Sequence, residues 1–212
     1  MTFKYRRYIN AGVPTRLTRA EQTDRNREAL LETARTVFVE RGYAGATLDA
    51  IAREAGFSKG VVYSQFASKA DLLLTLLERR IEDRARDNAR STRRTGPGPD
   101  ALRALVRANR RRSAQDTAWM RLTIEFRLAA AREPDVAARY ARVHERALDA
   151  LTSAVEDAAG PDLLPVGART FATFLFALDL GMTLERAADA GALPDRDVLT
   201  ILDHLLAPES TP

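Results

Sequence analysis

The spacing of small and apolar residues between positions 51 and 62 is the feature that most restricts the fold of this chain. Ile51 and Ala52 are followed by Gly56, four residues after the alanine, and by Val62, six residues after the glycine. A small residue lets two helices cross closely, a glycine adopts the positive φ of a tight turn, and a valine packs the second helix on the first. The spacing predicts a helix-turn-helix, although an ordinary helical hairpin can show part of it.

Apolar residues recur at helical spacing on both sides of this motif, and strand-like alternation is nearly absent. A first helix is predicted from Asn26 to a stop at Gly42. Val62 and Phe66 are expected to point inward from a later helix, and the GPGP sequence at 96–99 ends the fourth helix. The predicted N-caps of the second, third and fourth helices are Thr47, Ser58 and Ser68. The chain is therefore predicted to be all-α.

Positive charge is concentrated in the first half of the chain. Residues 1–94 hold 19 Lys and Arg against 12 Asp and Glu, whereas residues 95–212 hold 14 against 17. The first half therefore favours an anionic partner. Residues 1–24 are predicted to form a flexible basic arm, which is either a solvated tail or a segment that contacts DNA.

The residues that catalysis or metal binding would need are missing or scattered. There is no cysteine, which excludes disulfides and thiolate metal sites. His144 and His204 lie far apart, and each is expected to be structural, with His144 on the polar side of its helix. We expect no enzyme, no catalytic or metal-binding residues and no cofactor. Because no run approaches the ~20 apolar residues of a membrane span and no apolar leader is present, a cytoplasmic protein without a membrane partner is expected.

The run TLDAIAREAGFSKGVVYSQFASKADLL, residues 47–73, resembles the DNA-binding domain of TetR-type transcriptional regulators almost position by position. The preceding VFVERGY, residues 37–43, is similar to the end of that family's first helix. The resemblance implies a three-helix DNA-binding domain at 25–78. A fourth helix joins it to a larger helical effector-binding and dimerisation domain at 79–212.

The function that the resemblance implies is that of a ligand-responsive transcriptional regulator, by default a repressor. It would bind a palindromic operator of double-stranded DNA as a homodimer and be released by an unidentified small-molecule effector. Two alternatives stay open: a regulator controlled by a protein partner, and a non-specific architectural DNA-binding protein.

The resemblance also assigns the third helix to the major groove of DNA. The predicted DNA-binding residues are Thr47, Ser58, Lys59, Gly60, Val61, Tyr63, Gln65 and Lys69. Gly60 is expected to let the backbone approach the DNA, since glycine in a helix otherwise costs ~1 kcal/mol relative to alanine. Lys59 is expected to reach the O6 and N7 acceptors of guanine.

The other predicted contacts follow from the same resemblance. Gln65 stands where the family often has histidine or tyrosine, so that its role, adenine recognition by the amide, stays open. Val61 is expected to touch a thymine methyl group, and Ser58 a base or a phosphate. Phosphate contacts that set the register are expected from Tyr63, Lys69 and Thr47.

Two predicted helices supply a candidate dimer interface. Residues 135–158 form a long amphipathic helix, and residues 168–188 are apolar almost all round, which favours burial on two sides. A four-helix interface between two copies would bury both helices. The alternative is an intramolecular core.

An aromatic stripe provides a candidate effector pocket. The predicted pocket residues are Trp119, Thr123, Phe126, Arg127, Phe171 and Phe174, with Met182 beside them. Arg127 or Arg107 would neutralise an anionic effector. An aromatic stripe at helical spacing is equally typical of plain core packing, so both interpretations stay open.

Overall fold

The part of the chain that the computed structural model describes, residues 18–92, 96–161 and 163–206, contains helices and no strands. The predicted all-α fold class is confirmed. The helices are α1 (Arg19–Gly45), α2 (Leu48–Glu54), α3 (Lys59–Tyr63), α4 (Lys69–Thr92), α5 (Pro99–Gln115), α6 (Thr117–Ala130), α7 (Pro134–Ala159), α8 (Ala168–Ala188) and α9 (Asp195–Leu205). The two long helices predicted at 135–158 and 168–188 are observed as α7 and α8.

Helix α1 begins earlier than the predicted start at Asn26. The Thr18 hydroxyl accepts a hydrogen bond from the Glu21 N–H at 3.2 Å, and the Glu21 carboxylate accepts one from the Thr18 N–H at 2.7 Å. This capping box satisfies N–H groups that the first turn of a helix otherwise leaves free. Residues 19–24 are therefore helical, which corrects part of the predicted flexible arm. The rest of that arm, residues 1–17, lies outside the described residues.

Near its end, α1 bends at Gly42, whose φ is +68°. A Cβ at this position would lie 2.6 Å from a carboxylate oxygen of Glu125 in α6. The same oxygen accepts a hydrogen bond from the Tyr43 N–H at 3.0 Å. Both the backbone conformation and the close carboxylate thus require a residue without a side chain at the predicted helix stop.

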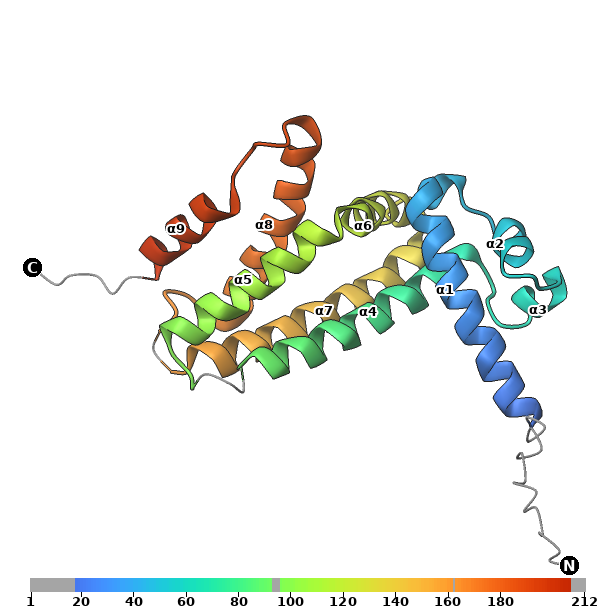
Figure 1. The fold of residues 1–212 in the computed structure, drawn as a ribbon, viewed down its shortest axis with the longest axis horizontal. Coiled ribbons are helices and arrows are strands. Elements are labelled where there is room, and N and C mark those ends of the chain that lie inside the picture. The colour runs from blue at the N-terminus through green and yellow to red at the C-terminus, as the bar shows by residue number, and fades with distance from the viewer. Residues whose placement is uncertain (1–17, 93–95, 162, 207–212) are drawn as a thin grey trace, which may run out of the picture.

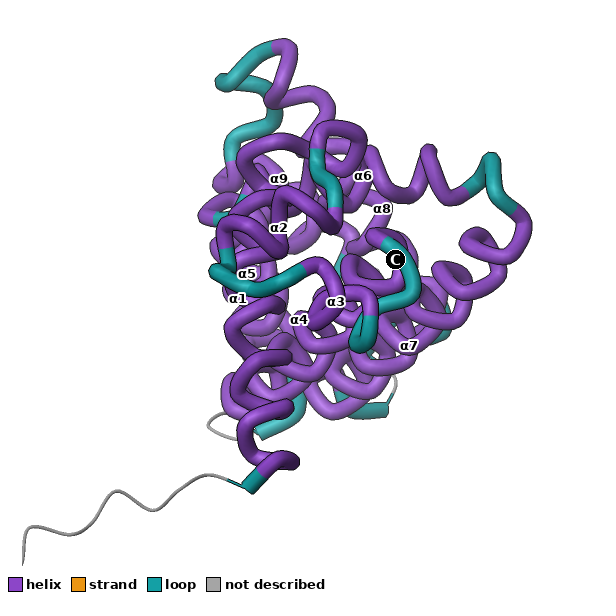
Figure 2. The backbone as a smooth tube through the Cα atoms, turned by 90° about the vertical axis from the view of Figure 1, so that its right-hand side faces the viewer, coloured by secondary structure: helices purple, strands orange, loops and turns teal. Residues whose placement is uncertain are grey.

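Helices α4 and α7 form the long axis of the molecule, side by side (Figure 1). They run in the same direction, as two ion pairs show. Asp71 of α4 pairs with Arg139 of α7, and seven residues further along both helices Glu78 pairs with Arg146. Helix α5 packs along both, α8 packs on α7, and α9 lies against α5. Helices α2 and α3 lie at the end of this axis, where they face the viewer in Figure 2.

Two apolar clusters form the core. The first contains side chains of α1, α2, α3 and α4 and continues into Trp119 and Phe126 of α6 and Tyr140 of α7. The second joins α5, the end of α7, α8 and α9. Because the first cluster crosses residue 78, the DNA-binding unit shares its core with the rest of the chain, and the division at 78/79 stays a prediction.

Two classes of feature are not found among residues 18–92, 96–161 and 163–206. None of their helices has the length and apolar character that crossing a bilayer demands. No cluster of three or more histidine, aspartate or glutamate side chains in this part of the chain is suited to hold a metal ion.

The aromatic contact between the two halves of the first cluster yields a stability prediction. Phe126 is fully buried, and its ring centroid lies 4.9 Å from that of Tyr43 and 5.7 Å from that of Tyr140. We expect Phe126→Ala to lower the free energy of unfolding by about 3–5 kcal/mol, measured by chemical denaturation. Leu128→Ala, on the same helix but 66% exposed, is the control and should change it by less than about 0.5 kcal/mol. Equal losses in both variants would contradict this assignment of the core.

Candidate nucleic-acid interface

The helix-turn-helix is formed by α2, the turn at Gly56 and α3. Gly56 has a φ of +74°, and the Phe57 N–H donates to the Ala52 carbonyl at 2.9 Å, which closes the end of α2. Val62 and Phe66 are buried in the first cluster. The predicted motif and its two inward side chains are confirmed.

Thr47 begins α2 as predicted. Its hydroxyl oxygen accepts a hydrogen bond from the Ala50 N–H at 3.1 Å. The hydroxyl hydrogen stays available, and the residue is exposed. Thr47 can therefore cap the helix and donate to a phosphate at the same time.

The N-cap and outer face of α3 expose four of the eight predicted contact residues, namely Ser58, Lys59, Gly60 and Tyr63. Ser58 occupies the N-cap position without a side-chain cap bond. Val61 is half-buried against the core. Gln65 is also half-buried, and its amide oxygen is buried without a hydrogen-bond partner in the described chain. In this structure that oxygen is turned away from the surface, and the adenine contact of the Gln65 amide stays a prediction.

Asp49 of α2 is a member of the site that sequence analysis missed. Its carboxylate pairs with the Lys59 ammonium and accepts a hydrogen bond from the Tyr63 hydroxyl at 3.4 Å. The hydrogen bond between the two charges raises the pKa of Lys59 and lowers the pKa of Asp49. Because both groups are exposed, the pair adds little stability, and Lys59 can exchange the carboxylate for an acceptor on DNA.

Lys69 has a role different from the predicted phosphate contact. Its ammonium donates to the carbonyls of Tyr43, Ala44 and Ala46 at 2.7, 3.3 and 3.1 Å and lies 4.5 Å from the centre of the Tyr43 ring. An ammonium has three N–H donors, so none is left for a phosphate. Burial lowers the pKa of Lys69. This lysine holds the α1–α2 turn, which corrects the prediction.

Gly60 is not required by the fold. A Cβ at this position would meet only the Ser58 hydroxyl, at 3.8 Å, which is ordinary contact. Its φ also lies outside the left-handed region, unlike that of Gly42 or Gly56. Glycine makes α3 less stable than alanine would, and no packing contact inside the chain requires the glycine.

The predicted effector residues are only partly brought together. Trp119 and Thr123 line an apolar cavity of about 90 Å³ between α4, α6, α7 and α8. Phe126, on the same helix, is packed between Tyr43 and Tyr140 instead. The shared helical face was predicted, but Phe126 points into the core.

The remaining predicted effector residues lie elsewhere. Phe171 and Met182 belong to the second apolar cluster. Phe174 is 42% exposed on the outer face of α8. Arg127 and Arg107 are exposed on α6 and α5. Helical spacing shows which residues share a face but not where the face points, which is why these residues were grouped wrongly.

Comparison with known proteins identifies relatives of both halves. The sequence model described as "Bacterial regulatory proteins, tetR family" matches residues 30–76, and that described as "BetI-type transcriptional repressor, C-terminal" matches residues 99–209. The chain is 37% identical over 128 residues to the HTH-type transcriptional activator FasR of Mycolicibacterium smegmatis, a match that covers 60% of this chain and 58% of FasR. It is 32% identical over 123 residues to the HTH-type transcriptional regulator BetI of Stenotrophomonas maltophilia, with 58% and 62% covered. Both matches span less than two thirds of the relative.

Solved structures share the fold over nearly the whole chain. The fatty acid degradation regulator FadR from Bacillus halodurans superposes with a TM-score of 0.69 at 17% identity, covering 88% of this chain and 97% of that one. FadR from Bacillus subtilis in complex with stearoyl-CoA gives a TM-score of 0.65 at 16% identity, with 84% and 95% covered.

The contrast between the two lysines can be measured. We expect Lys69→Met to lower the free energy of unfolding by about 1–3 kcal/mol, because three backbone carbonyls, two of them part-buried, lose their charged donor. Lys59→Met removes an exposed ion pair and should change it by less than about 0.5 kcal/mol. Thermal and chemical denaturation of both variants measures the difference. A stable Lys69→Met protein would contradict the structural role.

Proposed function

Because this chain belongs to the tetR family of bacterial regulatory proteins, we propose that it is a ligand-responsive repressor that binds a palindromic operator as a dimer. The chain is a transcriptional regulator with a helix-turn-helix DNA-binding unit. The observation that carries the finer proposal is the outer face of α3, where Gly60 leaves the backbone bare between exposed Lys59 and Tyr63.

We propose that α3 enters the major groove with Gly60 against the DNA. Lys59 exchanges Asp49 for a base acceptor, so the exposed pair holds the side chain near its target in the free protein. Tyr63 and Thr47 donate their hydroxyls to phosphates on either side and set the register. Base recognition then falls chiefly on Lys59, with Ser58 and Val61 at the edge of the contact.

A single short helix contacts only a few base pairs, so useful specificity needs a second copy in register. Helix α8 supports this requirement, because its outer face carries an uncharged exposed stripe. The stripe contains Thr170, Phe174, Ala177, Gly181, Leu184 and Ala188. The small residues in its middle permit close helix approach, and the charged outer face of α7 beside it is suited to an interface rim. We assign the dimer contact to this stripe with α7 at its edge.

The effector is assigned to the second domain. The cavity beside Trp119 and Thr123 supports this assignment, and a neighbour of the same fold was solved with stearoyl-CoA bound. The C-terminal match to BetI-type repressors favours repression, whereas the relative FasR is an activator. Repression is therefore the proposed direction, and the sign of regulation is an outcome of the experiment.

Selection of bound sequences from random DNA tests the function. We expect the purified protein to enrich one palindrome with half-sites about one helical turn apart. Enrichment of no sequence, with equal affinity for random DNA, would indicate a non-specific architectural protein instead. A reporter gene behind the selected palindrome then separates repression from activation.

The bare backbone at Gly60 predicts opposite changes in folding and binding. We expect Gly60→Ala to raise the stability of the protein by up to about 1 kcal/mol, because alanine is the better helix former and its Cβ has room. Affinity for the selected palindrome should fall by about tenfold or more, in the range of one lost groove contact. Gly167→Ala, where a Cβ would meet nothing within 4 Å, is the control and should leave DNA binding unchanged. Unchanged operator affinity in Gly60→Ala would refute the proposed approach of α3.

The α8 stripe predicts the oligomeric state. We expect the protein to be a dimer by light scattering, and Phe174→Glu combined with Leu184→Glu to yield monomers, because two charges would be buried without partners. The monomeric variant should lose most of its affinity for the full palindrome. Leu205→Glu, on the exposed side of α9, is the control and should stay dimeric. A monomeric wild-type protein that binds the palindrome tightly would contradict the proposal.

A further inference from the structure

An arginine-rich cleft lies next to the apolar cavity. It has a volume of about 550 Å³ and is formed by α1, α4, α5 and the start of α6. Its basic residues are Arg35, Arg79, Arg80, Arg84 and Arg112. Its acidic residues are Glu32, Asp83, Asp87 and Asp116. Asp83 and Asp87 pair with Arg86 and Arg90, which lie outside the cleft.

Several of these arginines lack an acidic partner. Within the part of the chain that the structure describes, no carboxylate lies within ion-pair distance of Arg35, Arg84 or Arg112. Within the described residues, the Arg84 side chain makes a single hydrogen bond, to the Ser113 hydroxyl at 3.5 Å. Arg112 donates to the Asn88 amide oxygen at 3.1 Å. Burial lowers the pKa of Arg84 to about 10, which still leaves it charged at neutral pH. Asp179 and Asp116 lie near Arg84 without forming an ion pair with it. A half-buried cation without a directly paired carboxylate favours an anion from outside.

The adjoining cavity is apolar but has two unsatisfied polar atoms at its wall. It is lined by Leu77, Ile81, Met120, Val143 and Phe176, among others. The indole N–H of Trp119 and one ring nitrogen of His144 are buried and have no hydrogen-bond partner in the described chain. Trp119 itself is only 2% exposed. Buried polar groups are rarely left unpaired, so each points to a partner that a ligand would bring.

His144 lies in this wall, not on the polar side of α7 as predicted. Its ring stacks on Tyr140 with the centroids 6.0 Å apart and meets Phe176 edge-on at 4.9 Å. Burial lowers the pKa of His144, so the neutral ring is favoured. A neutral imidazole accepts or donates one hydrogen bond to a bound polar group without adding charge.

The cleft and the cavity share Arg80, Arg84 and Trp119. Arg80 lies 5.3 Å from the centre of the Trp119 ring and is bonded to Asp116 at 2.5 Å. The shared side chains form a junction between the apolar cavity and the arginine-rich cleft. A ligand that matches both sites would need an apolar end for the cavity, a hydrogen-bond acceptor at the junction and negative charge at the end that lies in the cleft.

Resting on the proposed ligand-responsive function, we propose that the effector is an amphipathic anion: a short apolar chain in the cavity, an acyl carbonyl or carboxylate at Trp119 and Arg84, and an anionic head group in the cleft. The volumes of the cavity and the cleft indicate which part of the ligand each can hold. The cavity is far smaller than the ~300–1,000 Å³ of common ligand sites, whereas the cleft falls within that range. The bulk of the ligand is therefore the charged head group, and phosphates are the head-group chemistry that several arginines recognise best.

The head group would also reach the DNA-binding unit. Arg35 and Glu32 belong to α1, whereas Arg112 lies in the last turn of α5 and Asp116 joins α5 to α6. An anion bound by Arg35 and Arg112 connects α1 with the end of α5. The effector then acts directly at the boundary of the DNA-binding unit.

Calorimetric titration with four probes tests the site: hexanoyl-CoA, coenzyme A, hexanoate and 1-hexanol. We expect hexanoyl-CoA to bind most tightly, coenzyme A and hexanoate more weakly, and 1-hexanol at least ~10-fold more weakly than hexanoyl-CoA. Trp119 is the single tryptophan of the chain, so its fluorescence reports binding at the junction alone. The two anionic heads distinguish a phosphate-bearing thioester from a free carboxylate. Equal affinity for hexanoyl-CoA and 1-hexanol, or no change in fluorescence with any probe, would overturn the proposal.

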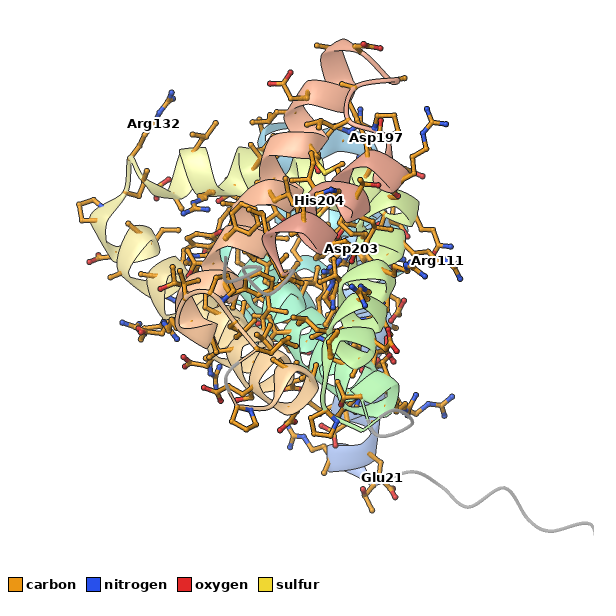
Figure 3. The ribbon with its side chains drawn as sticks, turned by 90° about the vertical axis from the view of Figure 1, so that its left-hand side faces the viewer. Glu21, Arg111, Arg132, Asp197, Asp203 and His204 are labelled. Carbon is orange, nitrogen blue, oxygen red and sulfur yellow. The ribbon has the colours of Figure 1, made fainter. Side chains whose placement is uncertain are left out.

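Two variants separate the parts of the site. Arg84→Gln should reduce the preference for hexanoyl-CoA over 1-hexanol by roughly 10- to 100-fold. Thr123→Met, which fills the cavity, should weaken the binding of the three chain-bearing probes, hexanoyl-CoA, hexanoate and 1-hexanol, and leave that of coenzyme A unaffected. Arg111→Gln is the matched control, because Arg111 projects outward from α5 (Figure 3), is exposed and does not line the cleft. This variant should bind every probe as the wild type does. If Arg84→Gln behaves like Arg111→Gln, the assignment of the anion fails.

Operator binding in the presence of hexanoyl-CoA distinguishes the two proposals. Probe binding at Trp119 without any change in operator affinity supports the site and refutes ligand-responsive regulation. Operator binding without any probe binding supports the DNA-binding function and refutes this site. Release of the operator by hexanoyl-CoA in the wild type, lost in Arg84→Gln, supports both.

Discussion

The backbone between Gly42 and Ala46 is held by two opposite charges from two different helices, and the position of the DNA-binding unit depends on this arrangement. The Lys69 ammonium of α4 donates to three carbonyls of the turn. The Glu125 carboxylate of α6 accepts a hydrogen bond from the Tyr43 N–H. Because the turn connects α1 to α2, its two charged anchors set the orientation of α2 and α3 relative to the rest of the molecule.

For the proposed effector, this arrangement would provide a physical route from the bound ligand to DNA. Trp119 and Thr123 line the cavity on α6, and Glu125 lies on the same helix, two residues after Thr123. A ligand that displaces α6 moves the carboxylate that holds the turn, and with it the angle of α3. Allosteric coupling of about 1–3 kcal/mol changes affinity by roughly 5- to 150-fold, so loss of one charge-assisted hydrogen bond is of sufficient size.

Local signals made much of the fold predictable from the sequence, whereas contacts between distant segments did not. The cap at Thr47, the turn at Gly56 and the inward Val62 are set by residues within one or two helical turns. Asp49 and Glu125 carry no comparable signal, since their partners lie 10 and 82 residues away in the chain. Lys69 was identified as important for the wrong reason: its place in the motif was clear, but three carbonyls 23 to 26 residues earlier occupy its donors.

The two faces of α8 constrain how the cavity can enlarge. Phe176 and Asp179 line the cavity, whereas Phe174 and Leu184 lie on the stripe assigned to the partner copy. In the proposed dimer, α8 would resist displacement, because its movement would open an apolar interface. An apolar ligand group larger than about 90 Å³ would then have to displace α4 or α6. These two helices carry Lys69 and Glu125, the side chains that hold the α1–α2 turn. In the proposed dimer, the strain of effector binding would thus be directed to the DNA-binding unit.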